Sequence, residues 1–327
     1  MAPHKRSGHL TSSLIRSMGD MISWSGIGDG RICIVNYHRI LKSFDPLLES
    51  EPDIESFRWQ MQVLAECFNV LPVHDALHAL ATHSLPPRAV CITFDDGYRS
   101  IHDFALPILK EFNLPATVFV TTGYIDAGNM WNDRILEAIR AVPNSQIDLR
   151  DMGLNVYQLQ TINDRKRAIN MLTEDAKYLP PEERQDLISK LEHLSGAVFE
   201  DRLMLSREML CALVDQGIEI GAHTISHPIL TRLDNSSARH EIEGGKKQLE
   251  KIIAKPVRLF AYPNGKTGVD FDERHVAMAR DAGFDAAFTT AFGAVTEKDN
   301  LYQIPRCRPW DATAFFYALR LLRLLAH

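Results

Sequence analysis

The chain has 327 residues, of which 45% are hydrophobic and 24% are charged, enough for one large α/β domain or two ordinary ones. A formal net charge of -6 excludes the strongly basic surface that nucleic-acid backbones require, so no nucleic-acid partner is expected. The five cysteines are odd in number and form no Cys-x-x-Cys pair, which favours small buried side chains in a reducing compartment over a disulfide framework.

Residues 1–30 begin with a basic cluster, but Ser12, Arg16 and Asp20 interrupt the apolar run that a signal peptide needs. No stretch offers the roughly 18 consecutive apolar residues of a membrane span. The sequence therefore predicts a cytoplasmic protein.

Strand-like and helix-like segments alternate in a first part at 31–123 and a second part at 206–310. Such alternation is typical of parallel strands joined by crossover helices. Seven or eight strands predict a distorted (β/α) barrel, with an open doubly wound sheet as the alternative. We expect strands at 32–35, 69–72, 89–94, 116–120, 218–222, 257–262, 285–290 and 303–308, and helices at 55–68, 73–82, 102–112, 206–217, 235–254 and 272–282.

Between residues 124 and 205 the alternation stops, and charged helical patterns appear at 131–141, 164–178 and 181–194. This favours an inserted helical subdomain, either a passive cap or a wall for a long substrate. Residues 311–327 form a last segment with an amphipathic, weakly basic helix expected at 313–325. That helix packs on its own domain or contacts a membrane surface, which would place the protein at the inner face of the membrane. Nothing in the sequence specifies an oligomeric state.

An apolar run from Ala89 to Phe94 ends in two adjacent carboxylates, Asp95 and Asp96, followed by Gly97. A run of this length suits a strand buried on both faces, and the glycine allows a sharp turn at its carboxyl end. Adjacent strand residues point to opposite sides, so one carboxylate can hold a cation while the other handles a proton. A solvated acidic turn is the alternative, because Asp-Gly is a common turn pair.

A second short apolar run at 218–222 ends in His223, and His227 follows four residues later. Two imidazoles at this spacing can converge on one cation if the backbone between them makes a single turn or a tight loop. His74 and His78 share the spacing but lie in an amphipathic helical pattern, which indicates surface or packed histidines. One carboxylate and two imidazoles leave positions open for water and substrate, as in a catalytic metal centre.

The motif Thr-Phe-Asp-Asp-Gly at 93–97, followed by His-Thr-Ile-Ser-His-Pro at 223–228, resembles the polysaccharide deacetylase superfamily, carbohydrate esterase family 4 or the NodB-homology group. Asn-Tyr-His-Arg-Ile at 36–40 and Phe-Ala-Tyr-Pro-Asn-Gly at 260–265 are similar to the subgroup that deacetylates poly-β-1,6-N-acetylglucosamine. The resemblance implies a metal-dependent hydrolase that removes acetyl groups from N-acetylated sugars of a polysaccharide or of its lipid-linked precursor.

The resemblance also implies a role for each motif residue. Asp95 is expected to be the general base. Asp96, His223 and His227 are expected to bind a divalent cation, zinc in the first place and cobalt, nickel or manganese otherwise. The backbone N–H of Tyr98 is a candidate donor to the oxyanion. Further contacts with the substrate are expected from Tyr262, Pro263 and Asn264.

Two features of the family pattern are missing from the sequence. The stretch at 260–265 lacks the arginine that steadies the base in many relatives, with Ala261 at the apparent position. No histidine at 284–308 supplies the general acid. His38, which follows the first strand, is the expected substitute acid, and His275 is a weaker one.

Two other functions stay open. A metal site specifies the class of reaction better than the substrate, which leaves an amidase or O-deacetylase acting on another substrate. The missing arginine and general acid leave a non-catalytic carbohydrate-binding relative. Retention of both Asp95 and Asp96 disfavours the binding protein, because sugar binding alone does not require a base beside a metal ligand.

Overall fold

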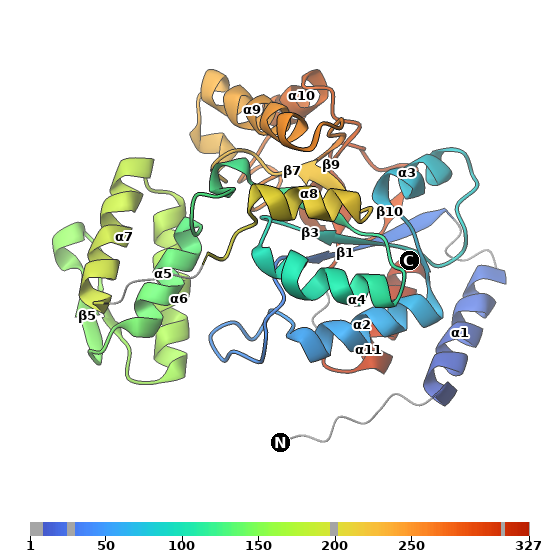
Figure 1. Ribbon diagram of the computed structural model, residues 1–327, viewed down its shortest axis with the longest axis horizontal. Helices are drawn as coiled ribbons and strands as arrows, with labels where there is room; N and C mark the ends of the chain where they lie inside the picture. The colour runs from blue at the N-terminus through green and yellow to red at the C-terminus, as the bar shows by residue number, and fades with distance from the viewer. Residues whose placement is uncertain (1–8, 25–29, 197–201, 309–310, 327) are drawn as a thin grey trace.

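The computed structural model describes residues 9–24, 30–196, 202–308 and 311–326 (Figure 1). Within them, seven parallel strands form a closed ring. The ring closes where the N–H of Asn36 donates to the carbonyl of Cys307 and the N–H of Cys307 donates to that of Ile34, both at 2.8 Å. The predicted distorted (β/α) barrel is therefore confirmed. Its strands follow the order β1 (Arg31–Tyr37), β3 (Ala89–Phe94), β4 (Thr117–Val120), β7 (Glu219–Ala222), β8 (Leu259–Ala261), β9 (Ala286–Phe292) and β11 (Ile304–Arg306).

Two short strands lie beside this ring. β2 (Asn69–Val70) runs parallel to the start of β3, and β10 (Val295–Thr296) pairs antiparallel with the start of β1. The strand expected at 69–72 is thus not a member of the ring. β10 was not predicted, because two residues give no periodic pattern. β3 is buried at all six positions, which explains its continuous apolar sequence.

Helices cover the outer face of the ring (Figure 1). Side chains at their N-termini accept backbone hydrogen bonds, as when Ser206 accepts from the N–H of Met209 (3.2 Å). A π-helical segment, η1 (Ile101–Ala105), precedes α4 within the helix expected at 102–112. Short 3-10 turns, η2 (Thr122–Tyr124) and η4 (Leu230–Arg232), lie after β4 and β7. The covering helices are α2 (Ile54–Cys67), α3 (Val73–Ala81), α4 (Leu106–Glu111), α8 (Arg207–Asp215), α9 (Asn235–Ile253) and α10 (Glu273–Asp281).

Helices at the two ends of the chain pack together on α2. Within the predicted N-terminal segment 1–30, α1 spans His9–Trp24, and residues 1–8 and 25–29 lie outside the described residues. The C-terminal helix α11 (Ala314–Ala326) buries Tyr317 and Leu321 in the barrel core. None of the helices that the structure describes is long and apolar enough to cross a membrane.

The residues predicted as a helical insertion have a hydrophobic core of their own, which lies to the left of the barrel in Figure 1. Besides the expected helices they contain a hairpin, whose three-residue strands are too short to predict from periodicity. The elements are α5 (Trp131–Ala141), β5 (Gln146–Asp148), η3 (Arg150–Met152), β6 (Val156–Gln158), α6 (Ile162–Lys177) and α7 (Pro181–Ser195).

A buried carboxylate ties this helical unit to the barrel. Asp133 on α5 accepts hydrogen bonds from the guanidinium of Arg39 (2.6 Å) and from the hydroxyl of Tyr98 (3.0 Å). Burial raises the pKa of Asp133 even though Arg39 lowers it. Since Tyr98 follows the Asp-Asp-Gly turn, α5 is attached directly to the segment that carries the candidate site.

Candidate metal centre and active site

Asp95 and Asp96 follow β3 at the carboxyl end of the barrel and are only 3% and 5% exposed. Asp96 (φ 73°) and Gly97 (φ 86°) are both left-handed, and the N–H of Gly97 donates to the carbonyl of Asp95 (3.0 Å). A Cβ at Gly97 would lie 3.0 Å from Cγ1 of Val120, so backbone and packing both favour glycine here. The sequence suggested that the two carboxylates point to opposite sides because adjacent strand residues alternate. In the structure they contact different partners because the backbone turns at Asp96.

Asp96, His223 and His227 converge at the mouth of the barrel. Nε2 of His223 and Nε2 of His227 each lie 3.4 Å from Oδ1 of Asp96, and one ligand atom from each residue lies within 4.8 Å of the others. Oδ1 of Asp96 is buried and makes no hydrogen bond with the described residues. Ligands placed tetrahedrally at about 2.1 Å from zinc are about 3.4 Å apart, so the three residues fit a divalent cation.

Hydrogen bonding and burial prepare both imidazoles to be ligands. Nδ1 of His223 lies 2.7 Å from the carbonyl oxygen of Ala261, so Nδ1 carries the proton and the lone pair of Nε2 faces Asp96. Burial lowers the pKa of His227 to about 4, which keeps its ring neutral. Burial opposes charge on His223 as well, but Asp96 outweighs it and raises the pKa of His223. A proton therefore competes with a cation at His223, and cation affinity should fall in acid.

Asp95 forms a bidentate ion pair with Arg306 inside the barrel. Its Oδ1 and Oδ2 accept hydrogen bonds from Nη1 (2.7 Å) and Nη2 (2.8 Å) of Arg306, and the amide of Asn36 donates to Oδ2 (3.0 Å). Burial alone would raise the pKa of Asp95, but Arg306 and the nearby imidazole of His223 lower it to about 2. Asp95 is therefore ionised throughout the physiological range.

The partners of Asp95 are themselves fixed. Arg306, 3% exposed, also donates to the carbonyl of Thr289 (3.0 Å) and to Oδ1 of Asn36 (3.0 Å). The hydroxyl of Thr93 donates to the same amide oxygen (3.0 Å). This network joins β1, β3, β9 and β11, so the geometry around Asp95 is set by the closure of the barrel.

Comparison with known proteins agrees with this site. The family model described as "Polysaccharide deacetylase" matches residues 82–287, which include Asp95, Asp96 and both ligand histidines. The chain belongs to the polysaccharide deacetylase family. Family membership and the geometry of the three ligands together account for the order of the motifs along the chain.

Two curated relatives of this polysaccharide deacetylase family member are poly-beta-1,6-N-acetyl-D-glucosamine N-deacetylases. The Staphylococcus epidermidis protein is 31% identical over 147 residues, which are 41% of this chain and 51% of the relative. A Staphylococcus aureus protein is 31% identical over 158 residues, which are 44% of this chain and 54% of the relative. The chain thus spans about half the length of the curated relatives it matches.

Two solved structures share the fold. The deacetylase PplD from Streptococcus pyogenes, in complex with acetate, superposes with a TM-score of 0.60 at 19% identity and covers 89% of this chain and 98% of its own. IcaB from Ammonifex degensii superposes with a TM-score of 0.56 at 18% identity, over 91% of this chain and 97% of its own. At 18–19% identity, the similarity to these two structures shows a shared fold alone.

The arginine that the sequence seemed to lack is present in the structure. We expected no such residue because Ala261 stands at its apparent position, but Arg306 comes from β11, which is separated from the Ala261 strand by β9. Ala261 instead uses its carbonyl to orient His223. The only signal in the sequence was a pair of basic residues, Arg306 and Arg308, in the short strand expected at 303–308.

The two acid candidates differ in their surroundings. Nε2 of His38 accepts a hydrogen bond from Arg308 (3.4 Å), so the neutral ring carries its proton on Nδ1. His275 is fully buried, where its Nδ1 accepts from the N–H of Asp272 (3.0 Å) and its Nε2 lies 3.1 Å from the carbonyl of Leu230. Both nitrogens of His275 thus stabilise the start of α10, and this ring is not available as an acid.

The predicted substrate residues after β8 fall into two groups. The Tyr262 side chain is fully buried, stacks on Phe271 with ring centroids 3.8 Å apart, and donates to the carbonyl of Tyr302 (3.1 Å). A substrate contact from this side chain is therefore wrong, because the ring belongs to the core. Pro263 is buried beside it, whereas Asn264 is half-buried and its side-chain nitrogen has no partner among the described residues. Asn264 stays a predicted substrate contact.

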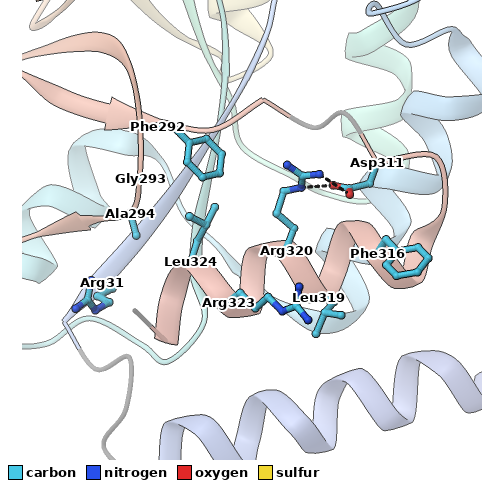
Figure 2. Close-up of a pocket in the computed structure, with 10 residues that line it drawn as sticks. All are labelled: Arg31, Phe292, Gly293, Ala294, Asp311, Phe316, Leu319, Arg320, Arg323 and Leu324. Carbon is cyan, nitrogen blue, oxygen red and sulfur yellow. Dashed lines mark hydrogen bonds and ion pairs between the residues drawn. The ribbon is translucent and has the colours of Figure 1, made fainter.

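A hollow of about 630 Å³ between α11 and the turn that links β9 to β10 is separate from the site (Figure 2). Its walls include Phe292, Leu324 and the ion pair between Arg320 and Asp311 (2.7 Å). None of its lining residues is a metal-ligand candidate, so we do not place the active site there.

Replacing Arg306 with methionine should destabilise the fold, because it leaves the Asp95 carboxylate buried without its partner. We expect a loss of about 3–5 kcal/mol in the free energy of unfolding, measured by urea denaturation at pH 7. Arg239→Met, which breaks an exposed pair with Glu243, is the matched control and should change stability far less.

The Arg306→Met variant should also change the acid dependence of stability. The pKa of Asp95 is lower in the folded protein than in the unfolded chain, so its contribution is complete above about pH 5 and is lost as the pH falls towards 2. In the Arg306→Met variant, the free energy of unfolding should no longer fall because Asp95 is protonated. Equal stability of variant and wild type at pH 7 would show that the ion pair does not support the fold.

Proposed function

We propose that this chain is a metal-dependent hydrolase that removes acetyl groups from the N-acetylated sugars of a polysaccharide. The observation that carries the proposal is an ionised, buried carboxylate beside a site for a divalent cation. Asp95 is held by Arg306, and its neighbour Asp96 belongs to the Asp-His-His group. A base next to a Lewis acid can hydrolyse an amide. The names of the staphylococcal relatives support β-1,6-linked N-acetylglucosamine as the substrate class.

In the proposed reaction, the C–N bond of the acetamide breaks and a C–O bond to water forms, which gives acetate and a free amine. A divalent cation held by Asp96, His223 and His227 would polarise the acetyl carbonyl and lower the pKa of water. Asp95 takes the proton of the attacking water. Among the described residues its Oδ1 accepts one hydrogen bond, from Arg306, so a lone pair of that oxygen stays free.

Two further groups complete the proposed mechanism. The N–H of Tyr98 has no backbone partner among the described residues, and we assign it to the developing oxyanion. His38 gives a proton to the leaving amine. The ring of His38 follows β1 at the same end of the barrel as Asp95 and Asp96, and its Nε2 accepts from Arg308 (3.4 Å), which supports this assignment.

A cleft of about 790 Å³ beside Tyr98 is the proposed path for the polymer. The loop after β1 forms one wall, where Phe44 is 66% exposed and offers a flat face for a sugar ring. Glu137 and Arg140 of α5 form the other wall, so the helical insertion would contact sugars next to the one that reacts. A lipid-linked precursor presents the same sugars and stays part of the proposal.

The alternatives now have unequal support. The non-catalytic carbohydrate-binding protein was suggested by a missing arginine and a missing general acid. The hydrogen bond from Arg306 to Asp95 supports the enzyme on the first point, and His38 is the proposed answer to the second. An amidase or O-deacetylase would use the same residues and differ only in the acyl compound, so a panel of substrates separates it from the proposed function.

Purified protein should release acetate from N-acetylglucosamine oligomers only when a divalent cation is bound. We would measure acetate from β-1,6- and β-1,4-linked oligomers before chelation, after chelation, and after adding back zinc, cobalt, nickel or manganese. Activity should disappear with chelation, return with metal, and be higher on the β-1,6 linkage. Bound metal without acetate release from either oligomer would contradict the proposed substrate class.

Asp95→Asn and His223→Ala should lose activity for different reasons. The first removes the base and retains the three metal ligands, so turnover should fall by about 100-fold or more while zinc stays bound. The second removes a ligand, so bound zinc and turnover should both be lost. Metal content by atomic absorption distinguishes the two, and a fully active Asp95→Asn protein would refute the assignment of the base.

His38→Ala should lower kcat without releasing metal, because this ring is the proposed acid and is not one of the three candidate ligands. A general acid typically contributes about 100-fold or more to the rate. The pH–rate profile should lose its alkaline limb in the variant. An unchanged profile would remove His38 as the acid.

A further inference from the structure

The two metal-ligand histidines are held in different ways. Nδ1 of His223 is fixed by the carbonyl of Ala261 (2.7 Å). Nδ1 of His227 is buried and has no hydrogen-bond partner among the described residues. Metal-bound histidines are normally oriented by a hydrogen bond from the second ring nitrogen. The direction of the His227 ring must therefore be set by the backbone that carries it.

That backbone is an unusual loop. Thr224 (φ 66°) and His227 (φ 57°) are both left-handed, although neither is glycine. The N–H of His227 donates to Oγ1 of Thr224 (3.1 Å) across the turn. Left-handed conformations of such residues cost free energy and persist only where surrounding contacts enforce them. The contacts that enforce this loop are therefore part of the metal site.

The side chain of Glu241 on α9 supplies those contacts on one side of the loop. Its Oε2 accepts from the N–H of Ile225 (2.8 Å) and the N–H of Ser226 (2.8 Å), and its Oε1 accepts from the hydroxyl of Ser226 (2.7 Å). On the other side, the N–H groups of Thr122 (3.2 Å) and Gly123 (2.8 Å) in η2 donate to carbonyls of the loop. The loop is thus clamped between η2 and one carboxylate.

The distance between α9 and the loop is set by a small residue. A Cβ at Gly245 would lie 3.0 Å from the backbone carbonyl carbon of Thr224. The helix can therefore lie directly against the loop, one turn beyond Glu241, and this close approach brings the carboxylate within reach of two successive N–H groups.

We infer that Glu241 is a positioning residue for the metal ligand His227: it fixes the 224–228 loop and replaces the hydrogen bond that the His227 ring lacks. The inference rests on the proposed metal site and adds to it a residue on a helix outside the barrel. Removing such a partner of a ligand usually weakens metal affinity by about 10- to 100-fold.

The test is the zinc dissociation constant of the whole chain at pH 7, measured by competition with a chromogenic chelator. Glu241→Ala should bind zinc about 10- to 100-fold more weakly. Glu241→Gln should stay close to wild type, because one amide oxygen can accept both N–H groups while its NH₂ donates to Ser226. Glu243→Ala, which loses only pairs with Arg239 and Lys247 on the same helix, is the matched control and should bind zinc normally.

Weak binding by Glu241→Ala, with rescue in Glu241→Gln and recovery of acetate release at excess zinc, would support the inference. Zinc affinity equal to wild type in Glu241→Ala would overturn it, even if the melting temperature falls, because that pattern describes a purely structural contact. If Glu241→Ala does not fold, Glu241→Asp takes its place, since the shorter side chain cannot span the same hydrogen bonds. A wild-type chain that binds no zinc would instead refute the proposed metal site.

Discussion

The ion pair between Asp95 and Arg306 is the constraint on which the rest of the molecule depends. It joins residues 211 positions apart, one directly after β3 and one on β11, and Asn36 of β1 contacts both of them. A carboxylate buried without a partner costs several kcal/mol, so β11 has to lie beside β1 whenever Asp95 is ionised inside the folded chain. Closure of the barrel therefore brings Arg306 to Asp95 and keeps the Asp95 carboxylate ionised.

The three ligands of the candidate metal site are held in two different ways. Asp96 and His223 follow buried strands, and the carbonyl of Ala261 fixes the His223 ring. His227 stands on a loop whose left-handed residues are kept in place by neighbouring elements. Two candidate ligands directly after strands and one on a loop suit a catalytic site, because three protein ligands would leave a position on a cation open for water or substrate.

The helical insertion is more than an appendage, although it has its own core. Asp133 reaches from α5 to Tyr98 and Arg39, and Lys177 of α6 lies 3.5 Å from the fully buried Asp270 in the loop after β8. Both contacts end on segments that border the candidate active site. The insertion therefore fixes the loops around the site, and α5 also lines the cleft next to Tyr98.

The sequence by itself determined the barrel and most of the candidate site. Alternating strand and helix patterns predict the fold, and Asp95, Asp96, His223 and His227 stand in short motifs directly after predicted strands. Arg306 could not be predicted as the partner of the base, because a three-residue strand carries no motif and its register depends on closure of the ring. The burial of the Tyr262 ring was decided in the same way, by its stacking on Phe271 in the loop that leads to α10. Local patterns specify elements, whereas contacts between distant strands exist only once the tertiary structure has formed.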